Sequence, residues 1–283
     1  MKKALTLLTS MLMVFTLAAC SSKNKINEEA LDTYVKATQN ITNIKSAAFD
    51  MKLLIDADEL NTHAKITMDG SFHAEKKLQM ALHMDAAVNG IGLEGLASVY
   101  MKNDVIYANI MDMEKEYMPL DDKMLSKLKL DKETGDPKKG VDKYFEEMTM
   151  ERKDGKKIIT AVMNKDGLSS AKDYANKSID DDIVNLKNGV TVTGVSEGSY
   201  ILTVNEQNQY ERVEMNITAS YEMEDEEQKK KTTDMSINMI LNLNDINSVK
   251  KIEFPSFKGY KKADSVKSEA NDLLDELSDE NAV

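Results

Sequence analysis

Apolar and polar residues alternate along the stretch from residue 47 to residue 86, and this pattern dominates the chain. Three successive runs, at 47–55, 64–69 and 78–85, carry an apolar side chain at every second position and polar side chains between them. A period of two is typical of strands that have one apolar face and one polar face. Because the joins between the runs are short and polar, the pattern predicts an antiparallel meander.

Further strands and several helices are predicted on both sides of this meander. The same alternation predicts strands at 93–101, 105–110, 115–120, 156–164, 190–195, 199–205, 209–223 and 232–243. Apolar residues at helical spacing predict helices at 28–45, 121–130, 141–148, 167–186 and 264–280. Asn27 is placed to cap the first helix. Residues 131–140, which include Gly135 and Pro137, are expected to form a surface loop.

The number of predicted strands decides the architecture. Roughly ten to twelve strands at about 4.8 Å spacing make a sheet about 50 Å wide, whereas one helix is about 10 Å across. The few predicted helices are too few to cover a flat sheet of that width, and wide sheets tend to curl. The expected fold is therefore α+β: a large curved antiparallel β half-barrel, with an N-terminal helix and a few helices covering the concave face.

Residues 1–20 have the features of a targeting leader. Lys2 and Lys3 form a basic start, and residues 4–19 are an apolar run that is short for a membrane span. The run ends in Leu17-Ala18-Ala19-Cys20, which resembles the lipobox of bacterial lipoproteins. The resemblance implies that Cys20 becomes the mature N-terminus and carries a diacylglycerol, which would anchor the chain to the cell membrane on its extracytoplasmic face. The alternative is an ordinary secretory leader that ends in Cys.

The rest of the chain is expected to form one domain between a tether and a tail. Residues 21–27 are short and polar, and residues 28–262 contain no linker and no internal repeat. Residues 263–283 are acidic and carry apolar residues at helical spacing. We expect this tail to be dispensable for folding, because it offers only one narrow apolar stripe.

Composition and motifs argue against nucleic acid, metal and enzymatic chemistry. A formal net charge of −12 repels phosphate backbones, so nucleic acid is not an expected partner. His63, His73 and His83 are evenly spaced, but the expected hairpin register holds them too far apart for one zinc ion. P-loop, dinucleotide-binding, zinc-protease and nucleophile-elbow motifs are absent from the sequence, and the Ser-x-x-Lys pairs at 126–129 and 169–172 lack companion motifs in the required order. We therefore expect a protein that is not an enzyme and has no cofactor.

Three local runs resemble the LolA/LppX-like superfamily of bacterial lipoproteins. They are the hairpin Tyr100–Tyr107, with the pattern Y-x-K-x-x-x-x-Y, the strand–turn–strand Val204–Tyr210, and the closing Ile252–Pro255. The resemblance covers about residues 28–258, and Tyr117 stands where relatives often carry Trp. It implies a half-barrel with helices on its concave side. It also implies that this concave face could hold an acylated lipid or a lipoprotein acyl chain.

Methionine is abundant on the apolar faces of the predicted strands. The chain has 19 Met, 6 Phe and no Trp. Met suits surfaces that accommodate variable apolar partners, but it can also fill a core that has few aromatic residues. As a hypothesis, the residues that line a ligand on the concave face are Phe49, Met51, Leu53, Ile66, Met68, Met80, Leu82, Met84, Met215, Ile217, Met235, Ile237 and Met239.

Two functions are compatible with these features. The first is a membrane-anchored, non-enzymatic binding module that holds a lipid, an acyl chain or another amphiphile on its concave face. The alternative is a structural or protein-interaction lipoprotein of the cell envelope, with a filled core and no ligand, that docks another envelope protein. A void lined by the residues above would favour the first function, and a filled interior would favour the second.

Overall fold

The computed structural model describes residues 25–41, 43–74, 77–121, 141–180, 191–224 and 230–263. The predictions for the leader with Cys20, for residues 122–140 and for the tail beyond residue 263 lie outside these ranges.

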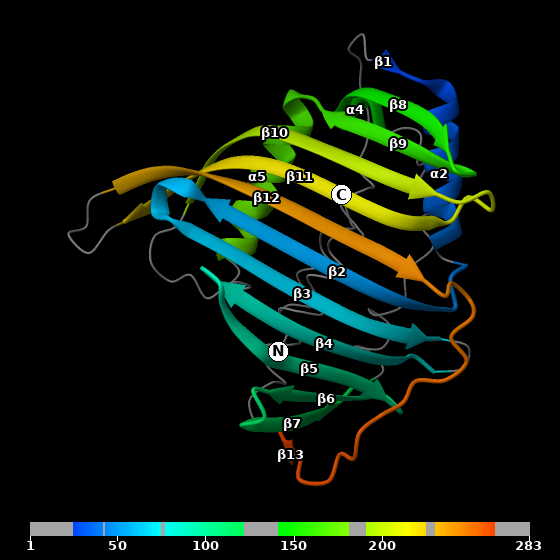
Figure 1. Cartoon of the computed structure of the whole chain (residues 1–283), viewed down its shortest axis with the longest axis vertical. Helices are drawn as coiled ribbons and strands as arrows, with labels where there is room; N and C mark the ends of the chain where they lie inside the picture. The colour runs from blue at the N-terminus through cyan, green and yellow to red at the C-terminus, as the bar shows by residue number, and fades with distance from the viewer. Residues whose placement is uncertain are drawn as a thin grey trace.

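One sheet of 13 strands forms the body of the protein (Figure 1). Its order is β1-β8-β9-β10-β11-β12-β2-β3-β4-β5-β6-β7-β13. The strands are β1 (Lys25–Ile26), β2 (Ser46–Ala57), β3 (Thr62–His73), β4 (Gln79–Val88), β5 (Ile91–Lys102), β6 (Val105–Ile110), β7 (Glu114–Pro119), β8 (Phe145–Lys153), β9 (Lys156–Met163), β10 (Thr191–Val204), β11 (Tyr210–Glu224), β12 (Lys230–Asn244) and β13 (Lys261–Lys262). The strands pair antiparallel except at the two edges, where β1 pairs with β8 and β13 with β7 in parallel.

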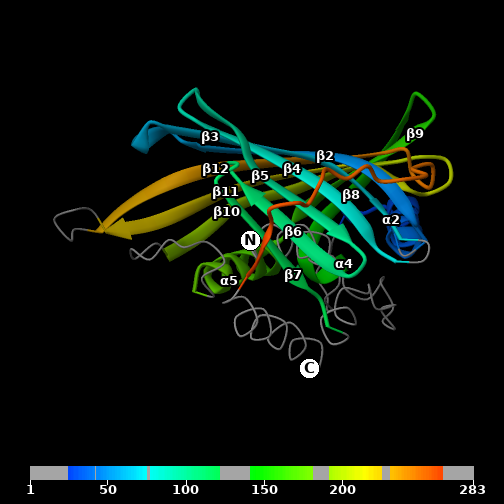
Figure 2. The same ribbon diagram turned by 90° about the horizontal axis from the view of Figure 1, so that it is seen from below.

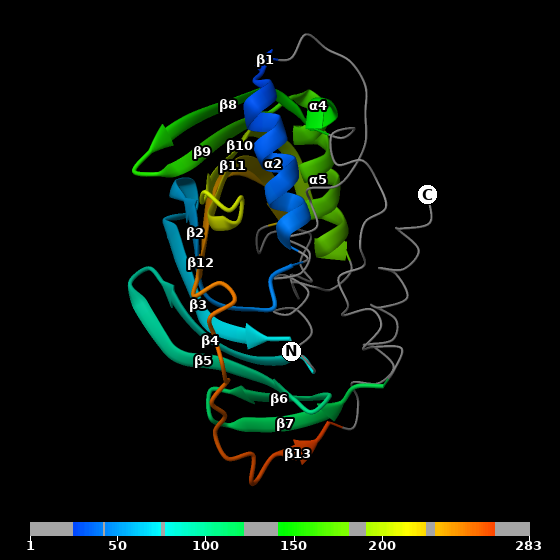
Figure 3. The same cartoon turned by 90° about the vertical axis from the view of Figure 1, so that its right-hand side faces the viewer.

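The sheet arches over the described helices, as Figures 2 and 3 show. These helices are α2 (Glu28–Ile41), α4 (Val141–Tyr144) and α5 (Lys165–Asp180), and a short 3₁₀ turn, η1 (Asp58–Leu60), joins β2 to β3. α2 and α5 both lie on the concave side (Figure 3). The predicted α+β half-barrel with helices on its concave face is therefore confirmed.

The register explains the alternation in the sequence. Paired positions on β10, β11, β12, β2, β3 and β4 hold one apolar row: Leu202, Val213, Leu241, Met51, Met68 and Met84. The adjacent residues on the same strands form a polar row on the opposite face: Thr203, Arg212, Asn242, Asp50, Asp69 and His83. The apolar rows share one buried cluster with Ala30 and Tyr34 of α2, so they face the concave side.

Two local features of the sequence position the helices α2 and α5. Asn27 caps α2 as predicted, because its Oδ1 accepts a hydrogen bond from the Ala30 backbone N–H at 2.9 Å. α2 ends at Ile41 rather than at residue 45. Gly198 of β10 leaves room for α5, since a Cβ there would lie 2.4 Å from Met163 Sδ and 3.1 Å from Leu168 Cδ2.

The helix predicted at 141–148 is wrong in its second half. α4 ends at Tyr144, and β8 begins at Phe145. Residues three apart point to opposite faces of a regular strand, but the β8–β9 register shifts between Phe145 and Glu147. This bulge allows Phe145 and Met148 both to be buried, and their spacing of three therefore imitates a helix.

The strands predicted at 190–195 and 199–205 are one strand, β10. Register shifts between Val192 and Gly194, and between Val195 and Glu197, interrupt the alternation without ending the strand. The sequence also gave no sign of β1 and β13. Each has two residues, which is too short to produce a periodic pattern.

A segment after β12 crosses the convex face of the sheet (Figure 1). Ile252 is buried there in a second cluster with Ala81 and Tyr100. The Phe257 ring stacks on Tyr107, with centroids 3.7 Å apart. The Tyr100–Tyr107 hairpin and the closing Ile252–Pro255 therefore have a structural role: they hold this segment so that β13 reaches and covers the edge of β7.

Candidate functional site

The thirteen predicted lining residues lie on one concave surface. Strand pairing joins the residues of β11 and β12 to those of β2, β3 and β4 without a gap. Successive paired positions hold Met215, Met239, Leu53 and Ile66 in one row, and Ile217, Ile237 and Ile55 in the next. The two distant groups expected from the sequence thus meet at the β12–β2 junction, in the middle of the sheet.

These thirteen residues differ in how far they are covered. Seven of them are buried: Phe49, Met51, Leu53, Met68, Met80, Leu82 and Met239. The other six are half-buried: Ile66, Met84, Met215, Ile217, Met235 and Ile237. The buried ones are packed core side chains in this structure, and the role of the whole set as ligand contacts stays a prediction.

On β4 and β5, exposure increases along the strands from one end of the concave face to the other. Leu82 and Met101 are only 2% and 1% exposed, whereas Val88, Ile91 and Leu93 are 46%, 73% and 42% exposed. The register places these last three residues on the same face, because Val88 pairs with Ile91, and Leu93 pairs with Ala86. We call the end with the β2–β3, β4–β5 and β6–β7 turns the open end, and the opposite end the closed end.

The exposed apolar side chains of the described ranges are concentrated at the open end. Among the residues that the structure describes, six of the seven large apolar side chains that are exposed lie on the turns of this end or on the strand residues beside them. They are Leu60, Val88, Ile91, Leu93, Met111 and Met113. The seventh, Tyr174, lies on α5. A concentration of exposed apolar side chains is typical of interaction surfaces.

The shape of the β4–β5 hairpin explains why its apolar residues stay uncovered. Asn89 and Gly90 form the turn with φ values of 50° and 81°, which is typical of a tight hairpin. The β4–β5 register then shifts between Met84 and Ala86. At this bulge the Gly95 N–H donates to Asp85 Oδ1 at 2.7 Å. The bulge adds residues to β5 without changing which positions alternate, so Ile91 and Leu93 stay on the same face as Ala97 and Val99. Val88 and Ile91 are missing from the predicted lining residues because the predicted run ended at residue 85.

Two tyrosines on the concave side stay neutral at ordinary pH. Burial raises the pKa of Tyr200 to about 12, and burial also raises the pKa of Tyr210. The Tyr210 hydroxyl lies 3.0 Å from Thr38 Oγ1 of α2, which ties the helix to β11. The Tyr200 ring packs edge-on to Phe145 with centroids 5.9 Å apart. This part of the concave face is therefore closed and uncharged at these positions.

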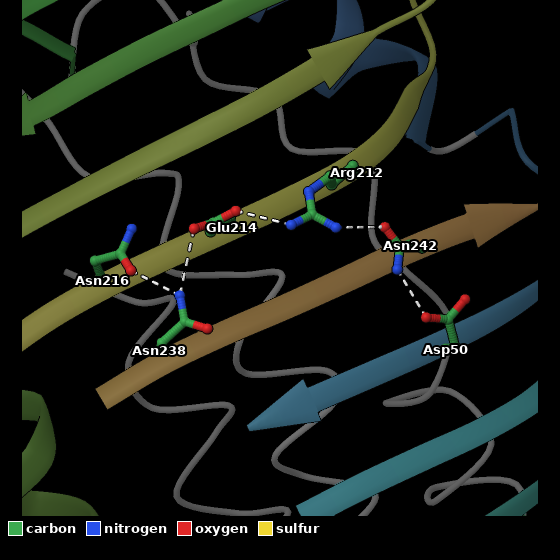
Figure 4. Close-up of polar contacts among 6 residues, drawn as sticks. All are labelled: Asp50, Arg212, Glu214, Asn216, Asn238 and Asn242. Atoms are coloured by element: carbon green, nitrogen blue, oxygen red, sulfur yellow. Dashed lines mark hydrogen bonds and ion pairs between the residues drawn. The ribbon is translucent and has the colours of Figure 1, made fainter. Parts of the chain in front are cut away.

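The convex face carries a polar network instead (Figure 4). Arg212 donates to Asn242 Oδ1 at 3.1 Å and to Glu214 Oε2 at 2.9 Å. Asn242 donates in turn to Asp50 Oδ1 at 2.7 Å, and Asn238 donates to Asn216 Oδ1 at 2.7 Å.

An open groove of about 720 Å³ lies beside this network. Its lining includes Asp50, Lys156, Arg212 and Asn242. Lys156 Nζ lies 2.7 Å from Glu211 Oε2, and Arg212 and Asn242 bond to the neighbours described above. Because these side chains satisfy one another, we assign the groove to the structure of the sheet rather than to ligand binding.

The three histidines are separated by the strand register. His83 pairs with Asp69, and His73 pairs with Gln79. His63 Nδ1 lies 2.8 Å from Asp56 Oδ1. In the described ranges, no group of three or more His, Cys, Asp or Glu side chains is arranged to hold a metal ion. No helix in those ranges is both long enough and apolar enough to cross a membrane.

Fold and site together define a class: a curved half-barrel with an apolar concave face that is buried at one end and is exposed on β4 and β5 at the other. Residues 27–257 match the family of unknown function DUF6612, and the chain belongs to this family. A comparison with curated protein sequences finds no match.

Several solved structures are similar in fold. The lipoprotein LppX of Mycobacterium tuberculosis is 11% identical, with 80% of this chain and 100% of that chain covered and a TM-score of 0.43. LprF of Mycobacterium bovis is 11% identical, with 83% and 100% covered and a TM-score of 0.40. A DUF1329 family protein of Desulfovibrio piger is 9% identical, with 82% and 97% covered and a TM-score of 0.24. These likenesses concern the fold alone.

Proposed function

We propose that this protein is a membrane-anchored extracytoplasmic lipoprotein that binds a lipid, an acyl chain or another amphiphile without enzymatic chemistry. The ligand's apolar chain would enter the concave face at the open end and lie along the apolar rows of β2 to β5. Cys20 would carry the diacylglycerol that holds the domain at the cell membrane.

One observation supports this proposal above all others: the apolar concave surface continues without interruption from buried core to exposed side chains. Val88, Ile91 and Leu93 prolong the rows that are buried further along the strands. Fully burying an apolar side chain of this size contributes about 1.5–3 kcal/mol relative to leaving it exposed. An acyl chain that lies on this part of the face would bury these side chains, and the complex would be stabilised by much of that free energy. In the protein without a ligand the same side chains stay exposed to water.

Native mass spectrometry of the chain from residue 21 onward, mixed with extracted bacterial lipids, tests the binding. We expect a retained lipid mass on the unmodified chain and little or none on Ile91→Glu, because a carboxylate at the open end disfavours an acyl chain beside it. Leu54→Glu is the matched control. Leu54 is a half-buried apolar residue whose register places it on the convex face, so this variant should still retain lipid. Retention of lipid by Ile91→Glu equal to that of the unmodified chain would contradict the proposal.

The alternative of a filled core without a ligand rests on the seven buried lining residues. It predicts that the unmodified chain retains no lipid at all and that both variants behave alike. In that outcome the exposed open end would be a surface for another envelope protein.

The anchor is tested separately from the ligand. Cys20→Ser should abolish the lipid modification, so that the precursor stays uncleaved or the protein is released from membranes. Unchanged membrane fractionation together with an unchanged mass would contradict the anchor and leave the proposal for the concave face intact.

A further inference from the structure

The apolar side chains of the open end stand next to carboxylates. Asp58 and Glu59 directly precede Leu60 in η1 and its turn, and Glu94 directly follows Leu93 in β5. Glu114 likewise follows Met113 at the start of β7. All four carboxylate side chains are exposed. Each of the three turns at this end therefore carries an exposed apolar residue and an exposed carboxylate that are neighbours in sequence. Glu94 follows Leu93 within β5, so its side chain points to the opposite face of that strand.

These four carboxylates have no cationic partner among the described residues. The other charges of the three turns are largely paired: Asp112 Oδ1 lies 3.0 Å from Lys115 Nζ, and Asp56 Oδ1 lies 2.8 Å from His63 Nδ1. A hydrogen bond from Asn109, together with Lys115, lowers the pKa of Asp112, so this carboxylate is also ionised at neutral pH.

The closed end shows the opposite arrangement. Glu29 of α2 pairs with Arg152, and Asp104 in the β5–β6 turn pairs with Lys77. Lys156 pairs with Glu211 at 2.7 Å. Each of these three ion pairs is neutral as a whole, whereas the four carboxylates without a described cationic partner leave an excess of negative charge at the open end. A charged molecule that approaches the open end experiences this excess as a steering field.

Resting on the proposed function, we infer that the amphiphile bound at the open end carries a positively charged head group. Its alkyl chain would contact the apolar concave surface that ends in Val88, Ile91 and Leu93. Its cationic head would then remain at the turns, next to Glu59, Glu94 and their neighbours. A fatty acid or another anionic amphiphile would bring like charge to the same place and would be disfavoured.

Three probes with the same dodecyl chain test the inference: dodecyltrimethylammonium, dodecylphosphocholine and dodecanoate, each below its micelle concentration. Affinities would be measured by isothermal titration calorimetry on the chain from residue 21 onward. Exposed charge pairs contribute little individually, but several acting on one head group should make the trimethylammonium probe bind about tenfold more tightly than dodecanoate at low salt. The difference should shrink as salt screens the charges.

The possible failures are distinguishable. Equal affinity for the three probes, or tighter binding of dodecanoate, would overturn the cationic head group and leave the proposed binding of an amphiphile standing. Absence of binding for all three probes would overturn the proposed function, and the inference with it.

A matched pair of triple variants locates the charges responsible. Glu59→Gln, Glu94→Gln and Glu114→Gln together remove three negative charges from the open end. Glu146→Gln, Glu206→Gln and Glu253→Gln together remove three from exposed positions elsewhere. The first variant should reduce the preference for the trimethylammonium probe to about twofold or less, and the second should leave it unchanged. A preference that persists in the first variant, with both proteins folded by thermal unfolding, would contradict the assignment.

Discussion

The closed and open ends of the concave face are built from the same kinds of residue, yet only one of them is core. Met68, Leu82 and Met101 at the closed end and middle of the face are almost fully buried. Ile91 and Leu93 continue the same rows, and they are exposed. The difference lies in what covers the strands and not in the strands themselves. Alternation therefore identifies the apolar face, while the three-dimensional arrangement decides which part of it is free to bind.

The largest expected effect contrasts the two ends directly. Met68 is 3% exposed and lies between Met51 and Met84 on neighbouring strands, so Met68→Glu would bury an unpaired charge. We expect the variant to unfold or to lose about 3–5 kcal/mol of its free energy of unfolding, because a buried charge without a partner is not tolerated. Urea denaturation measures this, with Met68→Leu as the control that should change stability by less than about 1.5 kcal/mol. A stable Met68→Glu variant would show that this residue faces a void.

The second effect concerns alkaline pH and the closed part of the face. Burial raises the pKa of Tyr200 from 10.0 to about 12, so the contribution of this residue to stability is complete below pH 10 and is lost as the pH rises to 12. One pKa unit corresponds to about 1.4 kcal/mol, so the expected loss over this interval is on the order of 3 kcal/mol. Urea midpoints measured between pH 10 and pH 12 should fall less steeply for Tyr200→Phe than for the unmodified protein. If the urea midpoint fell equally steeply with pH in both proteins, Tyr200 would be accessible to solvent.

The third effect tests how closely α5 packs against β10. Gly198→Ala places a methyl group against Met163 and Leu168, and we expect a loss of about 2 kcal/mol from overpacking. Gly92→Ala is the matched control at the open end, because a Cβ there meets nothing within 4 Å. That variant should change the free energy of unfolding by less than about 0.5 kcal/mol. Equal destabilisation by both substitutions would argue that α5 does not press on β10.

The smallest expected effect on stability belongs to the open end. Ile91 is 73% exposed, so Ile91→Glu should change the free energy of unfolding by no more than about 0.5 kcal/mol. The same type of substitution at Met68 is expected to cost several times more. If Ile91→Glu were as destabilising as Met68→Glu, the two ends would be equally packed, and the distinction between them would fail.

The sequence predicted most of the sheet because alternation survives wherever strands are regular. The meander of β2, β3 and β4, the fold class and the shared face of the thirteen lining residues all followed from a period of two. Two of the errors fall at β-bulges. At Phe145–Met148 a bulge imitates a helix, and within β10 two bulges divide one strand into two predicted ones.

The open end itself could not be predicted from the sequence. Val88 and Ile91 are ordinary strand residues by composition, and their exposure depends on which other elements reach them. The lack of a cationic partner for Glu59 and Glu94 among the residues that the structure describes is also a tertiary property. In a chain with 49 acidic and 37 basic residues, the pairing of any one carboxylate depends on its neighbours in space. The only local signal of this region is the Ile-Gly-Leu run at residues 91–93, which follows the Asn89-Gly90 turn. This pattern predicts a hairpin and does not identify a binding site.

Photocrosslinking tests the central claim most directly, because it reports where an alkyl chain lies on the protein. A dodecyl probe with a diazirine at the end of its chain would be bound to the chain from residue 21 onward, activated by light and mapped by mass spectrometry. The account predicts crosslinks on the concave face near Ile66, Met84 and residues 88–93. Crosslinks confined to the convex face, for example at Leu54 or Ile240, or a pattern unchanged by Ile91→Glu, would contradict it.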